Sequence, residues 1–178
     1  MNSPRAVCHC RRRQVLGGIL GLVLGYPATA TPTVTAPVVT APTVAALVLS
    51  CIDFRFVPIE QHFLATTGLT GQYDYTALAG ASLAIAGFPH PTAARTFWDQ
   101  LAIAYQLHHV RRVIMIDHQD CGAFALKIDP LLSRDPDREL SIHRRYSRQA
   151  ATAIRRRYPD VTVDTYWATL DGSVHSLL

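Results

Sequence analysis

Residues 110–122 read Val-Arg-Arg-Val-Ile-Met-Ile-Asp-His-Gln-Asp-Cys-Gly, an apolar run that leads into side chains able to bind metals. A second run, residues 45–50 (Ala-Ala-Leu-Val-Leu-Ser), leads into Cys51 in the same way. Short runs of small and apolar residues without alternation are typical of strands buried on both faces of a parallel sheet. Both segments are therefore predicted to be central strands.

The segments around these runs alternate between helical and extended patterns. Apolar residues recur at helical spacing after Pro91, a residue suited to the first turn of a helix, and predict a helix of about four turns. Two further helices are predicted over residues 58–66 and 137–157. Two further strands are predicted over residues 73–79 and 161–168, and the strand over residues 161–168 is expected to be the last of the chain. This order predicts an α/β fold with a mostly parallel central sheet flanked by helices.

The ends of the two central strands carry the candidate chemistry. Ligand sites in parallel sheets lie beyond the carboxyl ends of the strands, which here means just after Ser50 and Ile116. Cys51, His118 and Cys121 fall at these two places. Two thiolates and one imidazole form a ligand set that zinc accepts, and they leave a fourth position open for water.

Other interpretations of the same residues remain open. Cys8 and Cys10 lie in the first 30 residues, which are predicted below to be an export signal and to be removed. The two cysteines that remain in the exported chain, Cys51 and Cys121, could form a disulfide. A purely structural zinc site would instead use Asp53 as its fourth ligand. Asp117 and Asp120 flank the ligands and are interpreted chiefly as turn-forming residues, with support of the ligands as the alternative. Surface positions are predicted for the histidines without a partner pattern, which are His62, His90, His143 and His175.

The pattern Cys-x-Asp-x-Arg, followed later by His-x-x-Cys-Gly, resembles that of the β-class carbonic anhydrases. Residues 163–174 also resemble the last strand and turn of that family. The resemblance implies that Cys51, His118 and Cys121 bind one Zn²⁺ per chain, and that Asp53 and Arg55 form the catalytic aspartate–arginine pair. One departure is Ala77-Leu78-Ala79-Gly80, which stands where the family often has Arg-Asn-Ala-Gly.

The family resemblance implies a carbonic anhydrase-type lyase that hydrates carbon dioxide reversibly to bicarbonate by means of zinc-bound hydroxide. It also implies a homodimer or a higher even oligomer. Two alternatives keep the zinc site: hydrolysis of carbonyl sulfide or carbon disulfide, and a zinc-stabilised binding domain without catalysis. The expected partner is in either enzymatic case a small molecule.

The first 30 residues predict export. Arg11–Arg13, an apolar run over residues 15–24 and the sequence Ala28-Thr29-Ala30 have the anatomy of a secretory signal peptide. The arginine pair followed by apolar residues resembles the bacterial twin-arginine signal, with the general secretory route and a membrane anchor as alternatives. A Thr/Pro-rich linker is predicted over residues 31–43 and the zinc-binding α/β domain over residues 44–178. The mature protein is expected in the periplasm or outside the cell, without a stable membrane span.

Charge and composition narrow the range of functions. The chain has 178 residues, of which 49% are apolar and 17% charged, enough for one packed core. Its 17 basic and 13 acidic residues give a net charge of +4. Four of the arginines lie in the first 30 residues, so the remainder carries 13 basic and 13 acidic residues and is neutral. Such a balance gives no support for nucleic-acid binding.

Overall fold

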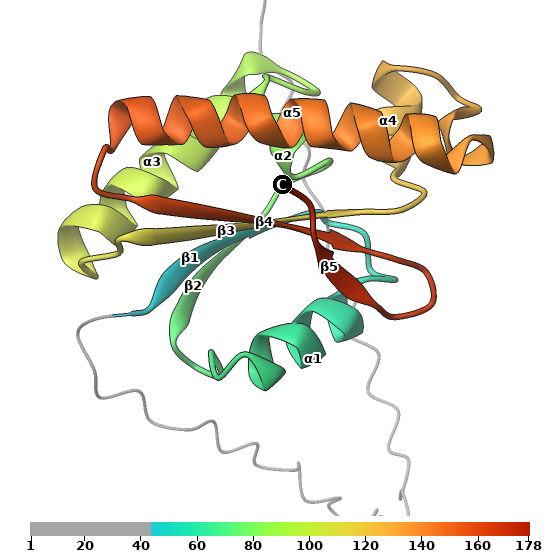
Figure 1. Ribbon diagram of the computed structural model, residues 1–178. Helices are drawn as coiled ribbons and strands as arrows, with labels where there is room; N and C mark the ends of the chain where they lie inside the picture. The colour runs from blue at the N-terminus through green and yellow to red at the C-terminus, as the bar shows by residue number, and fades with distance from the viewer. Residues whose placement is uncertain (1–43) are drawn as a thin grey trace, which may run out of the picture. The chain divides into compact units, whose positions relative to one another are not determined.

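A five-stranded sheet forms the centre of the part of the chain that this computed structural model describes, residues 44–178 (Figure 1). Its strands lie in the order β2-β1-β3-β4-β5, and only the edge strand β5 is antiparallel to its neighbour. The strands are β1 (Ala46–Ser50), β2 (Tyr73–Ala77), β3 (Arg112–His118), β4 (Thr162–Ala168) and β5 (Val174–Ser176). The mostly parallel α/β fold predicted from the sequence is confirmed.

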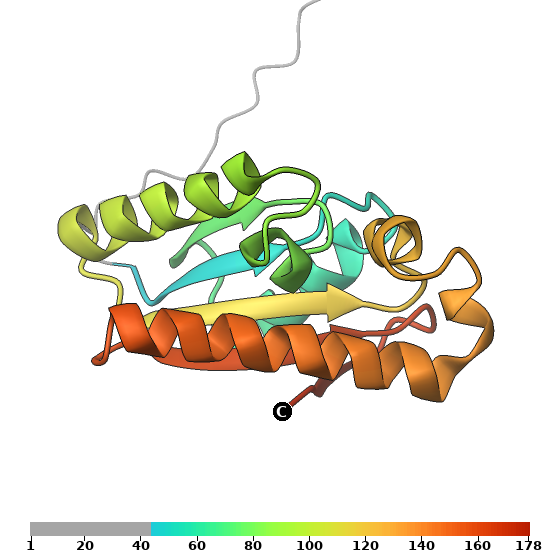
Figure 2. The same ribbon diagram turned by 90° about the horizontal axis from the view of Figure 1, so that it is seen from above.

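Helices cover both faces of the sheet (Figure 1). The upper face in that view carries α2 (Ser82–Ile85), α3 (Pro91–Leu107) and α5 (Pro136–Arg157), and the lower face carries α1 (Val57–Thr66). Figure 2 shows α5 and α3 crossing this upper face, with the short α2 between them. Beyond the carboxyl end of β3 follow α4 (Gly122–Lys127) and a 3₁₀ turn over Leu132–Arg134.

The two central strands are apolar on both faces because each face packs against a helical layer. Successive side chains of a strand point to opposite faces. One core cluster therefore unites Leu47 and Met115 with Phe97 of α3 and Ile154 of α5. The opposite cluster unites Val48, Ile114 and Ile116 with Phe56 and with Leu64 of α1. This two-sided burial explains the continuous apolar runs of the sequence.

Several element boundaries differ from the sequence predictions. The strand predicted over residues 110–116 continues through His118, so the candidate histidine ligand belongs to β3 itself. The strand predicted over residues 161–168 is not the last one, because a turn containing Gly172 (φ 90°) leads into β5. Neither α2 nor α4 was expected, since helices of four and six residues are too short to show a periodic pattern.

The predicted signal peptide (residues 1–30) and linker (residues 31–43) lie outside the described residues. Within residues 44–178, none of the helices combines the length and the apolar character needed to cross a bilayer.

Candidate metal centre

Cys51, His118 and Cys121 meet at the carboxyl edge of the sheet. Cys51 directly follows β1, His118 is the last residue of β3, and Cys121 is the N-cap of α4. These elements adjoin because β1 and β3 are neighbouring parallel strands. The Cys Sγ atoms and a ring nitrogen of His118 all lie within 4.8 Å of one another, and all three residues are buried. The structure thus brings together the three residues predicted to be ligands.

The two cysteines are free thiols in this structure. Their Sγ atoms lie 4.0 Å apart, about twice the length of a disulfide bond. The structure therefore shows a thiol pair in place of the disulfide that was the alternative interpretation. A separation of this order suits two sulfur ligands of a single ion, since each Zn–S bond is about 2.3 Å long.

The imidazole of His118 has one nitrogen available for a metal. Its Nδ1 lies 2.8 Å from the carbonyl oxygen of Gln119, which can only accept, so Nδ1 carries the proton. Its Nε2 is buried and has no hydrogen-bond partner among residues 44–178. The Phe56 ring stacks on the imidazole at a centroid distance of 4.1 Å and fixes its plane. An oriented, unpartnered Nε2 beside two thiols is the arrangement that a zinc ligand requires.

The environment of Cys51 favours its thiolate form. The backbone N–H of Gly80 donates to Cys51 Sγ at 3.2 Å. Hydrogen bonding from Cys121 is the main cause that lowers the pKa of the Cys51 thiol, against the opposing effect of burial. The same contact and burial raise the pKa of Cys121. The pair thus holds one proton fewer than two ordinary thiols, and thiolate is the form that binds metals.

The turn that supplies the Gly80 N–H has unusual backbone geometry. Gly80 has φ 79°, and a Cβ at this position would lie only 3.0 Å from the Cβ atoms of Leu83 and Ala123. Ala81, which is fully buried, has φ 42° and ψ −98°. A non-glycine residue at such angles costs on the order of 1–3 kcal/mol, so the surrounding contacts must hold it in place.

Asp53 and Arg55 form the pair that the resemblance implied. Arg55 donates from Nε to Asp53 Oδ1 at 3.0 Å and from Nη2 to Oδ2 at 2.7 Å. These hydrogen bonds hold the pKa of Asp53 below its usual range. Arg55 also reaches the loop after β3, donating to Asp120 Oδ2 at 2.8 Å and to the Asp120 carbonyl oxygen at 2.9 Å. The guanidinium therefore joins the two loops that carry the ligands.

Asp120 occupies a turn, as predicted, and has a positive φ of 55°. Its backbone N–H donates to Glu139 Oε1 of α5 at 2.8 Å. Glu139 is only 1% exposed, and burial raises the pKa of its carboxyl. Sequence reasoning missed Glu139 as a residue that holds the ligand loop against α5.

Asp117 and His143 occupy positions that differ from the predictions. Asp117 belongs to β3 and not to a turn, and it is buried. The surface position predicted for His143 is wrong: its ring is fully buried between Phe124 and Trp167, at centroid distances of 3.6 and 4.6 Å. His143 Nδ1 lies 3.0 Å from Asp117 Oδ2, a partner that the sequence did not reveal. The other three histidines, His62, His90 and His175, are exposed as predicted.

Glu60 is a second buried carboxyl near the centre that sequence reasoning missed. It is 1% exposed, and its Oε2 accepts hydrogen bonds from the hydroxyls of Ser50 and Tyr75. Its Oε1 has no partner in the part of the chain that the structure describes. Burial is the main cause that raises the pKa of Glu60 to about 7. The position lies on α1, one turn after Phe56, and nothing in the local sequence distinguishes it from an exposed helical glutamate.

Glu60→Gln should change how the stability of the protein depends on pH. Glutamate in the unfolded chain ionises near its ordinary value of 4.5, whereas folded Glu60 stays protonated up to about pH 7. In the wild type, the contribution of protonated Glu60 to the free energy of unfolding is therefore complete below pH 4.5 and is lost as pH rises to about 7. The loss amounts to about 3 kcal/mol. Urea unfolding of both proteins at equal zinc concentration should show the Glu60→Gln variant gaining on the wild type across this range, and a constant difference would contradict the prediction.

Two hollows open beside the ligand cluster. The first has a volume of about 520 Å³ and is lined by Asp53 and Arg55 together with apolar side chains, Ile52, Phe54, Phe88 and Leu126 among them. The second, of about 410 Å³, lies toward β2 and is lined partly by Tyr73 and Tyr75. Cys51 and Ile52 border both hollows. Both hollows therefore adjoin the candidate ligand Cys51, and their walls are mostly apolar.

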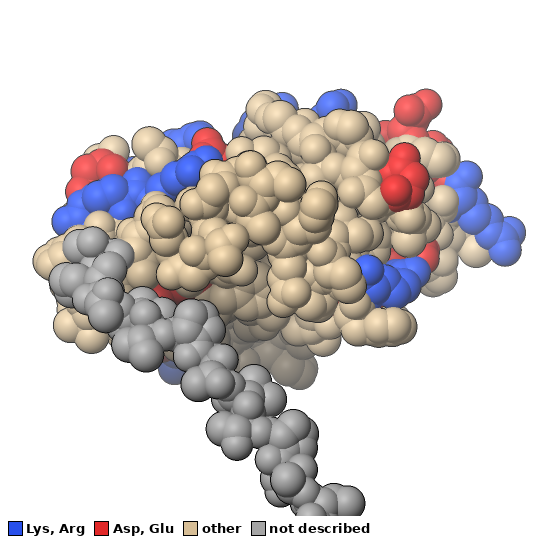
Figure 3. Space-filling view, turned by 90° about the horizontal axis from the view of Figure 1, so that it is seen from below, with Lys and Arg blue, Asp and Glu red and all other residues tan. Residues whose placement is uncertain are grey.

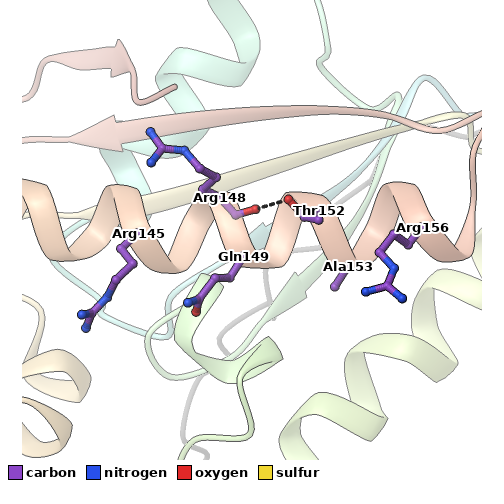
Figure 4. Close-up of a pocket in the computed structure, with 6 residues that line it drawn as sticks. All are labelled: Arg145, Arg148, Gln149, Thr152, Ala153 and Arg156. Carbon is purple, nitrogen blue, oxygen red and sulfur yellow. Dashed lines mark hydrogen bonds between the residues drawn. The ribbon is translucent and has the colours of Figure 1, made fainter.

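A third hollow of about 460 Å³ lies along α5, away from the ligand cluster (Figure 4). Arginine side chains flank it, with small and neutral residues between them. Its lining residues are Arg145, Arg148, Gln149, Thr152, Ala153 and Arg156. This lining includes no thiol, imidazole or carboxylate, so the hollow offers neither a soft metal site nor an acid–base group.

Comparison with known proteins agrees with this geometry. Residues 41–178 match the model of the family described as "Putative carbonic anhydrase". The chain belongs to this family. Two similar proteins are uncharacterized proteins of Rickettsia conorii and Rickettsia bellii, each 28% identical over 131 residues. The match covers 74% of this chain and 70% and 80% of the two relatives.

Solved structures of carbonic anhydrases share the fold. A β-carbonic anhydrase of Trichomonas vaginalis superimposes with a TM-score of 0.54 at 13% identity, over 81% of this chain and 87% of its own. A carbonic anhydrase of Glaciozyma antarctica gives 0.52 at 16% identity, over 78% and 84%. At such low identity the likeness establishes the β-carbonic anhydrase fold alone. The Cys-His-Cys group of this chain fits the zinc site of that fold.

Proposed function

We propose that this family member is a zinc-dependent carbonic anhydrase that hydrates carbon dioxide reversibly to bicarbonate and a proton. One observation carries the proposal: the ligand atoms of Cys51, His118 and Cys121 converge while the neighbouring carboxylate of Asp53 is held by Arg55. Among the described residues the cluster contains no carboxylate, which supports an open fourth position over a closed structural site.

The proposed ligands are Cys51 Sγ, His118 Nε2 and Cys121 Sγ, and the metal they suit is Zn²⁺. Bound there, zinc supplies a Lewis acid that makes a water molecule nucleophilic near neutral pH. Asp53 contributes an ionised carboxylate that accepts a hydrogen bond from the attacking water and so orients the lone pair of its oxygen. Arg55 keeps this carboxylate ionised and turned toward the guanidinium.

The hollow of about 520 Å³ supports a small uncharged substrate. Ile52, Phe54, Phe88 and Leu126 offer it an apolar wall, while Asp53 lies on the same wall next to Cys51. A linear molecule without charge or strong hydrogen-bonding groups suits such a wall. Carbon dioxide has these properties, and so do carbonyl sulfide and carbon disulfide.

Stopped-flow hydration of carbon dioxide by the purified protein, with zinc content determined, tests the proposal. The rate should rise with pH between about 6 and 9, through an ionisation near 7 that belongs to zinc-bound water. Asp53 should add no second ionisation in this range because its pKa lies below the usual value. One zinc per chain without any rate would refute carbon dioxide as the substrate, and turnover of the sulfur gases would then identify the reaction. A protein that binds no zinc would refute the site itself.

We further propose that two or more copies associate around the site. Side chains beside it are strongly exposed, with Phe54 at 82% and Leu126 at 83%. The face that carries α1 shows mainly uncharged side chains, with charged ones toward its margins (Figure 3). Two β-carbonic anhydrases of Sordaria macrospora that share the fold are tetrameric. Sedimentation of the purified protein at micromolar concentration would distinguish an even oligomer from a monomer.

Export remains part of the proposal. The basic, apolar and small-residue segments of residues 1–30 support a signal peptide, with the arginine pair favouring the twin-arginine route. Replacing Arg12 and Arg13 by lysine should retain the protein in the cytoplasm if that route is used. Unchanged export would indicate the general secretory route.

A further inference from the structure

The carboxylate of Asp117 gathers four buried donors next to the metal centre. Its Oδ1 accepts the backbone N–H of Ser82 at 3.0 Å, and its Oδ2 accepts the Ser82 hydroxyl at 2.6 Å. From α5, His143 Nδ1 and the Ser147 hydroxyl also donate to Oδ2, each at 3.0 Å. Asp117, Ser82, His143 and Ser147 are all at most 2% exposed. Burying so many polar groups costs free energy unless all of them are hydrogen-bonded, so a network of this kind fixes the positions of its side chains.

The position of this network connects it to the ligand Cys51. Ser82 directly follows the turn formed by Gly80 and Ala81, and the Gly80 N–H donates to Cys51 Sγ at 3.2 Å. On the other side of the turn, Leu78 N–H is bonded to the carbonyl oxygen of Ser50 at 2.9 Å, as a continuation of the strand pairing. Hydrogen bonds therefore fix the backbone on both sides of the strained turn, at Leu78 before it and at Ser82 after it.

We propose that Asp117 is a positioning residue of the metal centre: by anchoring Ser82, it holds the Gly80–Ala81 turn so that the Gly80 N–H donates to the Cys51 sulfur. This inference rests on the proposed role of Cys51 as a metal ligand. A donor on a metal-bound sulfur stabilises the negative charge of the thiolate, and partners of this kind commonly change metal affinity about 10–100-fold. Asp117 thus acts on the metal through two residues of backbone and touches no reacting atom.

The geometry of the turn explains why an anchor is needed. Ala81 has a backbone conformation that side-chain-bearing residues rarely adopt, with φ 42°. Released from Ser82, the turn would relax toward ordinary angles and carry the Gly80 N–H away from the sulfur. Ser147 offers a matched control because it donates to the same carboxylate oxygen, yet it lies on α5 and no hydrogen bond joins its side chain to the turn among the described residues.

Asp117→Ala, measured on the full protein, tests the inference in two ways. Zinc affinity from chelator competition should fall about 10–100-fold. In the cobalt-substituted protein, the sulfur-to-metal charge-transfer band should move to longer wavelength, because a thiolate without its N–H donor gives up an electron more easily. Asp117→Asn keeps an oxygen acceptor for the Ser82 N–H and gains an NH2 group that can donate to the Ser82 hydroxyl oxygen, so both links to Ser82 remain and the spectrum should stay close to that of the wild type. Ser147→Ala should unfold more easily in urea and leave the band and the zinc affinity unchanged.

A folded Asp117→Ala protein with wild-type zinc affinity and an unmoved band would overturn the inference. An equal shift in Ser147→Ala would also overturn it, because loosening of the core alone would then explain the effect. If Asp117→Ala does not fold, Ser82→Ala decides: it removes the hydroxyl link to the turn and should move the band in the same direction. A wild-type protein that lacks the sulfur-to-cobalt band refutes the metal centre itself, which separates that failure from a failure of the positioning role.

Discussion

Cys51→Ser should abolish stoichiometric zinc binding and, with it, catalysis. The substitution replaces a soft thiolate, which the Gly80 N–H and the Cys121 thiol both stabilise, by a hydroxyl that does not ionise at neutral pH. Only two of the three ligands then remain. We expect zinc affinity to fall by at least about 1,000-fold, since bound zinc at such sites contributes on the order of 10–16 kcal/mol through all of its ligands.

Zinc content after dialysis and chelator competition measure this effect directly. Cys121→Ser should give the same loss, and the double variant, in which His118 is the last of the three ligands, should bind zinc more weakly still. Ser147→Ala removes a buried polar group outside the cluster and should keep one zinc per chain. Retention of one zinc per chain by Cys51→Ser would disprove the ligand assignment.

Asp53→Asn should lower kcat/KM for carbon dioxide about 100- to 10,000-fold while zinc stays bound. Asparagine preserves the shape of the side chain but removes the acceptor charge that Arg55 stabilises. Arg55→Ala should have a comparable effect by a different cause. Without the guanidinium, Asp53 loses the hydrogen bonds that Arg55 donates from Nε and Nη2. The hydrogen bond from Arg55 to the carbonyl oxygen of Asp120, which joins the loop after β3 to the loop after β1, is lost as well.

Arg112→Ala provides a matched control for the arginine substitution. Arg112 pairs with Asp164 at 2.7 Å and is about as exposed as Arg55, with 38% against 36% of its side chain accessible. It lies at the start of β3, whereas the metal ligands lie at its end. Stopped-flow rates should therefore be unchanged in Arg112→Ala. A similar loss of rate in both variants would show that Arg55 serves stability and not the reaction.

The central fold and the meeting of the three candidate ligands could be predicted from the sequence because burial on both faces leaves a strong local mark. The stretches 46–49 of β1 and 113–116 of β3 are apolar without a break, and in a parallel sheet the carboxyl ends of neighbouring strands lie at the same edge. Cys51, His118 and Cys121 follow from that one rule and from the chemistry of zinc. Three-residue β5 and four-residue α2 carry too few positions for any period.

The supporting residues Glu60 and Glu139 were missed, and Asp117 was interpreted chiefly as a turn residue, for a different physical reason. Asp117, Glu60 and Glu139 are buried polar groups whose partners come from elements distant in sequence. A polar residue in a strand or helix ordinarily indicates an exposed position. One signal was available along α5: Glu139, His143 and Ser147 recur every four residues and continue into the apolar Ala150 and Ile154. They therefore occupy the buried stripe of that helix.

The chain order of the ligands links metal supply to the persistence of the fold. Cys51 and Cys121 are separated by 70 residues, and α1, β2, α2, α3 and β3 all lie between them. An ion held by both sulfurs closes this long stretch into a ring, as a covalent cross-link would. Such a closure removes on the order of 4 kcal/mol of chain entropy from the unfolded state. When zinc is scarce, the metal-free protein would then unfold more often and be cleaved more readily by proteases.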